Sequence, residues 1–113
     1  MKTPQEIEQM LMALPDVVRA YPYGNSIAVY KLHNTEGIMF ALIDEQSSPL
    51  RVSLRCDTQL AQLLRDKYES VLPGFNLNKN QWNTVLMTGQ VPEDELQDLI
   101  RHSYEIATQS ATD

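Results

Sequence analysis

Basic and aromatic side chains at strand-like spacing are the residues of this 113-residue chain whose types could do chemistry. Arg51, Ser53 and Arg55 alternate with apolar residues and share one strand face, because successive strand residues point to opposite sides. Lys31 lies in an earlier strand-like run, and Lys79 is close in sequence to Trp82, the only tryptophan. Basic residues beside aromatics on a sheet contact phosphates and stack bases, so this pattern is compatible with nucleic-acid binding.

A simpler interpretation fits the same residues. Arg51 and Arg55 are then solvated outward positions of a half-buried sheet, and Trp82 is part of the core. Arg19 and Tyr21 also share a face of the first strand and would extend the basic and aromatic set. From residue types and spacing alone, the solvated-face interpretation is the more economical of the two.

The charge distribution does not favour a general phosphate-binding surface. The net charge is −6, and most of it falls in residues 83–113, which contain one basic residue, Arg101, and six acidic residues. Residues 15–82 are neutral, with seven basic and seven acidic side chains, so a local basic face remains possible there. Phosphate-backbone binding depends on Lys and Arg, which makes an acidic domain a poor default for it.

Catalytic and metal-binding patterns are missing from the sequence. The four glycines are scattered and none opens a glycine-rich phosphate loop. His33 and His102 are far apart and lack a second ligand at helical spacing, and Cys56 stands alone without a neighbouring base. We therefore expect a non-catalytic protein with no cofactor and no metal. A single cysteine and the lack of an 18-residue apolar run predict a cytoplasmic protein with no membrane span.

The elements that would position the basic residues follow from periodicity and turn residues. A helix begins after Thr3 and ends before Pro15, and four strand-like runs follow up to Leu54. Asp57 caps a second helix that reaches about Tyr68 and buries Leu60, Leu63, Leu64 and Tyr68. Residues 71–79 form an irregular connection before the Trp82 strand, and an acidic helix runs from about 92 to 108. Together they predict one α+β domain over residues 1–113, an antiparallel sheet with helices on one face.

The last predicted helix has a polar residue on its apolar face. Helical spacing places Ser103 between Leu99 and Ala107, so its hydroxyl needs a buried partner such as the Leu99 carbonyl. Strand phasing predicts that Trp82 packs against this helix and that the Trp82 stretch docks the C-terminal elements onto the sheet.

Four segments resemble the MmcQ/YjbR family of small bacterial proteins: Leu14-Pro15 with Tyr21-Pro22-Tyr23-Gly24, Met39-Phe40-Ala41 with Val52-Ser53-Leu54-Arg55-Cys56-Asp57, Pro73 to Lys79, and Trp82-Asn83-Thr84-Val85 ahead of Ser103-Tyr104. The resemblance implies a fold similar to CyaY-like and secretion-chaperone-like proteins, with the order α-β(4)-α-β(1-2)-α. It also implies DNA binding, a label commonly attached to this family, and no catalytic site. This chain has Gln81 where family members usually have a histidine.

Two functional hypotheses follow. In the first, the protein binds DNA through a basic sheet face, using Lys31, Arg51, Arg55, Lys79, Trp82 and Asn83. In the second, it is a protein-interaction or chaperone-like domain, as its acidic last helix and net charge of −6 suggest. A third and weaker alternative is metal or small-ligand binding in a groove beside Trp82.

Overall fold

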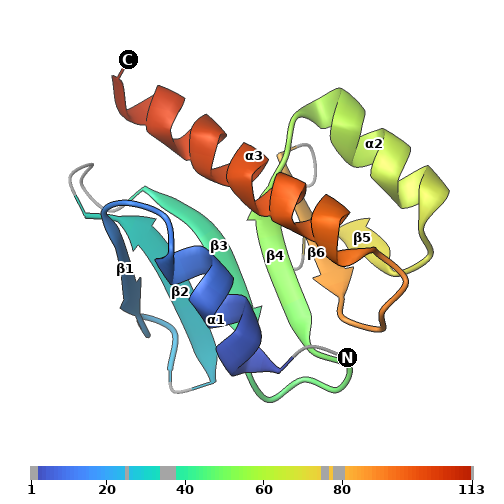
Figure 1. Ribbon diagram of the computed structural model, residues 1–113, viewed down its shortest axis with the longest axis horizontal. Helices are drawn as coiled ribbons and strands as arrows, with labels where there is room; N and C mark the ends of the chain where they lie inside the picture. Colours follow the sequence, from blue (N-terminus) through green and yellow to red (C-terminus); the bar gives the residue numbers. More distant parts are fainter. Residues whose placement is uncertain (1–2, 25, 34–37, 75–76, 78–80, 113) are drawn as a thin grey trace.

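The described residues of the computed structural model form three helices and six antiparallel strands (Figure 1). The structure describes residues 3–24, 26–33, 38–74, 77 and 81–112. In chain order the elements are α1 (Pro4–Met12), β1 (Val17–Ala20), β2 (Ile27–Leu32), β3 (Met39–Asp44), β4 (Arg51–Arg55), α2 (Thr58–Lys67), β5 (Val71–Pro73), β6 (Trp82–Leu86) and α3 (Glu93–Thr112). The predicted α+β class and element order are confirmed.

The strands form one sheet in the order β1-β2-β3-β4-β6-β5. The first four strands are a meander, and β6 lies between β4 and β5 and pairs with both. β3 has an apolar sequence and occupies a central position in the sheet, between β2 and β4. The prediction of an irregular connection at residues 71–79 was wrong for its first part, because β5 pairs with β6 as a short edge strand.

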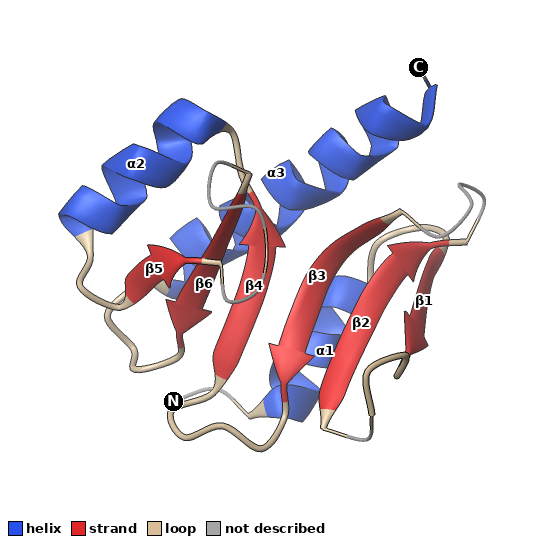
Figure 2. Ribbon diagram, turned by 180° about the vertical axis from the view of Figure 1, so that it is seen from behind, coloured by secondary structure: helices blue, strands red, loops and turns tan. Residues whose placement is uncertain are grey.

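The described helices lie on one face of this sheet, and none of them lies on the other (Figures 1 and 2). α1 begins with the predicted capping box, in which Thr3 and Glu6 satisfy each other's backbone amides. α3 packs across β3 and β4 and buries Leu96, Leu99, Ile100, Ser103 and Ala107, the face that its spacing predicts. The core therefore lies between the helices and one side of the sheet.

Ser103 connects α3 to the sheet. Its side chain is fully buried, its hydroxyl donates to the Phe40 carbonyl at 2.5 Å, and its oxygen accepts the Arg55 amide at 2.8 Å. The need for a buried partner is confirmed, although the partners are sheet backbone groups and not Leu99. An edge-on contact between the rings of Phe40 and Tyr104, 5.5 Å apart, reinforces the same junction.

α2 packs less tightly than the sequence predicts. Asp57 caps it as expected by accepting the amides of Gln59 and Leu60. Ala61 and Leu64 are its buried residues, whereas Leu63 is 64% exposed and was wrongly assigned to the core. The helix lies near the short strand β5 at the end of the sheet, and Leu60 packs against the core while Leu63 points to solvent. No helix in the described part of the chain is long and apolar enough to cross a membrane.

Candidate nucleic-acid interface

Strand register decides which side chains share the uncovered face, which we call the open face. Side chains of directly paired residues in an antiparallel sheet point to the same side. Val52 and Leu54 belong to the core under the helices, so Arg51 and Arg55 point the opposite way. Lys31 lies between the core residues Tyr30 and Leu32 in the sequence, so its side chain points to the open face, as those of Arg51 and Arg55 do. The strand register therefore places Lys31, Arg51 and Arg55 on the same face of the sheet, as predicted.

The open face is locally positive. Among the strand residues assigned to it, Lys31, Arg51 and Arg55 are opposed by one carboxylate, Asp44, which pairs directly with Arg51. Three cations less one carboxylate leave a local charge of +2, against −6 for the whole chain. Arg51 is exposed, and Lys31 and Arg55 are half-buried. Apolar side chains lie beside these charges, including Leu42 and the 37% exposed Val18.

Arg55 is held in place by its surroundings. Its Nε donates to the Met39 carbonyl at 2.6 Å, and its guanidinium carbon lies 4.9 Å from the centre of the Trp82 ring. Burial lowers the pKa of Arg55 from its ordinary value. A guanidinium that is stacked on an indole and hydrogen-bonded to a backbone carbonyl has a fixed orientation, and its planar set of donors is suited to pairing with an anion.

Trp82 lies on the other side of the sheet from the position expected for it. It pairs with Arg55, and so points away from α3, whereas Val85 of the same strand belongs to the core under the helices. The prediction that Trp82 packs against the last helix was wrong. Its side chain is nevertheless only 3% exposed. A base cannot stack on it in this conformation.

Gly74 contributes to the cover over Trp82. Its amide donates to the Trp82 carbonyl at 3.0 Å, and a Cβ added to Gly74 would lie 2.7 Å from the Trp82 Cβ. Contacts that short require the backbone to shift, so Gly74 permits a close approach that other residues would prevent. Lys79, the predicted cation of this region, lies outside the described residues.

Asn83 faces α2 and not the open face. Its side chain is 2% exposed, its Oδ1 accepts Nε of Arg65 at 2.8 Å, and its Nδ2 donates to the Ala61 carbonyl at 3.3 Å. The amide thus ties α2 to β6 and does not point to the surface as a nucleic-acid contact would. Because Asn83 directly follows Trp82 in a strand, the sequence alone indicates that their side chains point to opposite faces of the sheet.

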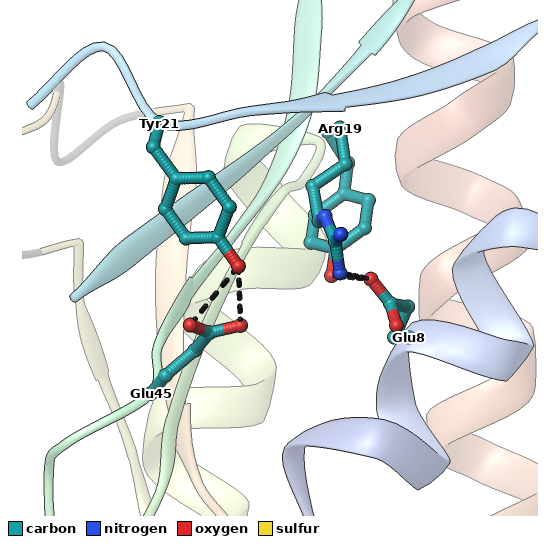
Figure 3. A network of polar contacts seen from close by, with 5 residues as sticks. Glu8, Arg19, Tyr21 and Glu45 are labelled. Atoms are coloured by element: carbon teal, nitrogen blue, oxygen red, sulfur yellow. Dashed lines mark hydrogen bonds and ion pairs between the residues drawn. The ribbon is translucent and has the colours of Figure 1, made fainter. Parts of the chain in front are cut away.

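Arg19 and Tyr21 share a face, as predicted, but it is not the open face. Arg19 pairs with the core residue Tyr30 and forms a salt bridge with Glu8 of α1. Figure 3 shows this pair beside a second one, in which the Tyr21 hydroxyl donates to Glu45. Sequence reasoning missed Glu8 and Glu45 as partners, because no local pattern links residues 8, 19 and 45.

The groups of a conventional active site are not assembled in the described residues. No cluster of three or more His, Cys, Asp or Glu side chains that could hold a metal ion occurs among them. Cys56 is buried, and burial raises the pKa of its thiol to about 11, which keeps it protonated and unreactive at neutral pH. His102 accepts the Asp57 amide at 3.2 Å at the start of α2.

The fold and this open face define a small α+β domain with one helix-covered and one uncovered sheet surface. The YjbR family model matches residues 12–106, and the chain belongs to the YjbR family. It is 36% identical over 72 residues to the uncharacterised protein YjbR of Escherichia coli K12, a match that covers 64% of this chain and 61% of that protein. It is 29% identical over 99 residues to the uncharacterised protein YbdF of Escherichia coli O157:H7, covering 88% and 79% respectively.

Solved structures share this fold. A crystal structure of a Deinococcus radiodurans protein superposes with a TM-score of 0.91 at 33% identity, covering 96% of this chain and 80% of that one. A Pseudomonas syringae protein shares the fold with a TM-score of 0.79 at 22% identity, over 94% of this chain and 99% of that one.

Proposed function

We propose that the protein is a non-catalytic, cytoplasmic DNA-binding protein that contacts the phosphate backbone through the open face. The observation that carries this proposal is the local charge of +2 contributed by Lys31, Arg51 and Arg55 against Asp44 in a chain of charge −6. Phosphate contacts need cations on a surface that a duplex can reach, and this face carries no helix (Figure 2).

The burial of Trp82 and Asn83 refines the contact set. Neither side chain is exposed, so the proposed interface consists of Lys31, Arg51 and Arg55, with Lys79 as a further candidate. An interface of cations without an accessible stacking ring favours backbone contact over base recognition. The affinity should therefore depend strongly on salt and weakly on sequence.

The test is a fluorescence-anisotropy titration of labelled duplex and single-stranded DNA at low salt. We expect log K to fall with log salt, with a slope of about −0.9 for each phosphate neutralised on duplex DNA. Arg51→Gln should reduce that slope by about one contact. Arg101→Gln is the matched control, because Arg101 is an exposed arginine on α3, away from the open face. The proposal fails if the wild-type protein does not bind either DNA at about 50 μM.

A protein partner is the second candidate for the same face. What favours it is the mixture of cations with the exposed Val18 and the half-buried Leu42, which suits an acidic amphipathic segment better than a bare phosphate backbone. Sedimentation and affinity capture with wild type and Arg51→Gln would test it. A strictly monomeric protein whose captured partners are unaffected by Arg51→Gln would count against this candidate.

A further inference from the structure

A polar hollow lies at the first edge of the sheet, on the helix-covered side. It has a volume of about 300 Å³ and is lined by Pro4, Gln5, Glu8, Arg19, Tyr21 and Glu45. We call it the Tyr21 hollow. This volume is at the lower end of the range for small-molecule sites.

Separate elements supply the charged groups of the hollow. Glu8 comes from α1, Arg19 from β1, and Glu45 from the turn after β3. Figure 3 shows the Arg19–Glu8 ion pair and the Tyr21–Glu45 pair side by side. The Arg19 guanidinium carbon lies 5.6 Å from the centre of the Tyr21 ring and connects the two pairs. The hollow thus depends on the tertiary fold and not on a single loop.

The lining of the hollow has more negative than positive charge. Its two carboxylates are opposed by one guanidinium, which leaves a charge of −1. Both nearby phenols use their protons on these carboxylates: Tyr21 donates to Glu45, and Tyr30 donates to Glu8 at 3.2 Å. Their oxygens therefore remain as acceptors, and Arg19 supplies the cationic donors.

The titration behaviour of the lining agrees with this charge. Partial burial, followed by the hydrogen bond to Glu45, raises the pKa of the Tyr21 hydroxyl. The charge of Glu8 raises the pKa of Arg19. The shift of Arg19 is the one expected beside a carboxylate, and burial is the larger cause at Tyr21. Both groups keep their protons through the physiological range.

We propose that the Tyr21 hollow binds an alkylammonium or alkylguanidinium group between Glu8 and Glu45, beside the Tyr21 ring. A cation completes the charge balance, donates to lone pairs that the two carboxylates retain beside their bonds from Arg19, Tyr21 and Tyr30, and gains from contact with an aromatic ring. The same chemistry comes from a free amine or from a lysine or arginine of a partner protein. The site is independent of the proposed DNA contact, because Arg51 and Arg55 lie on the opposite face of the sheet.

Two-dimensional ¹H–¹⁵N spectra of the full chain can test this proposal. The probes are n-butylammonium, n-propylguanidinium, and an Ala-Arg-Ala peptide capped at both ends, with n-butanol as the neutral control. We expect saturable shifts for residues 8, 19, 21 and 45 with the cations and none with n-butanol. Tighter binding of the peptide assigns the cation to a partner protein, and tighter binding of a free cation assigns it to a small molecule.

Isosteric variants show whether the carboxylates are responsible. Glu45→Gln retains an oxygen that can accept the Tyr21 proton but removes the charge, and should weaken binding about tenfold or more, as loss of a charge-assisted hydrogen bond predicts. Glu105→Gln makes the same change at an exposed position of α3 and should leave binding unaltered. The proposal is overturned if no cation causes saturable shifts by about 10 mM. Equal weakening by the two variants would also overturn it.

Discussion

The two faces of the sheet differ in how their polar groups are used. On the helix-covered face, Ser103 and Asn83 are buried and hydrogen-bonded to residues of other elements. On the open face, Arg51 is exposed and Lys31 is half-buried. Polar groups on the first face connect separate elements, whereas the second face combines a buried Ser53–Thr84 hydrogen bond with the exposed charge of Arg51. Substitutions on the two faces should therefore have different consequences, and the predictions below test that difference.

The largest expected difference in stability loss is between substitutions at two residues of β3. Phe40 is fully buried against Tyr104 of α3, and Leu42 is half-exposed on the open face. Phe40→Ala should destabilise the protein by about 3–5 kcal/mol through the cavity it leaves. Leu42→Ala should cost less than about 2 kcal/mol, because part of that side chain already contacts water. Urea unfolding of both variants measures the difference, and equal losses would contradict the division into two faces.

Cys56 tests the helix-covered face by its reactivity. Its thiol pKa is raised to about 11 from the ordinary value of 9.0, first by burial and then by Asp57. Folding thus favours the protonated thiol, and this contribution to stability is present below pH 9 and is lost as the pH rises towards 11. At pH 8 the shift makes the thiolate about 100-fold scarcer than in an unfolded chain. Labelling with a thiol reagent should be slower in the native protein by at least that factor, and equal rates with and without urea would refute it.

Two buried serines give a smaller contrast. Ser103→Ala removes the partner of both the Phe40 carbonyl and the Arg55 amide, and should cost about 1–3 kcal/mol. Ser53 on the open-face side of β4 shares a 2.8 Å hydrogen bond with the Thr84 hydroxyl. Ser53→Ala should cost about 1 kcal/mol, because no backbone group loses its partner through that bond. Thermal unfolding of the two variants measures both losses of stability. A larger loss for Ser53→Ala than for Ser103→Ala would contradict this prediction.

Local patterns were enough to predict most of the fold. The capping box at Thr3, the Asp57 cap and the alternation through β4 each depend on residues a few positions apart. The burial of Ser103 followed from helical spacing in the same way. Such signals survive in a single sequence because the interactions that they report are themselves local.

The site was harder to predict because it depends on which face each strand presents. Alternation showed that Arg51 and Arg55 share a face, but not that Trp82 joins them and turns away from α3. Asn83 was grouped with Trp82 by sequence proximity, although adjacent strand residues point to opposite sides. The link between Glu8, Arg19 and Glu45 required the tertiary packing of α1 against the sheet edge.

The smallest expected change in stability is at Arg51 itself. Arg51→Gln should alter the free energy of unfolding by no more than about 0.5 kcal/mol, because the side chain is exposed and its backbone amide keeps the bond to Ser47. If the same variant loses about one unit of salt dependence in DNA binding, its charge serves binding and not folding. Urea unfolding and DNA titration of one preparation measure both quantities. A stability loss above about 1 kcal/mol would instead give Arg51 a structural role and remove the main cation from the proposed interface.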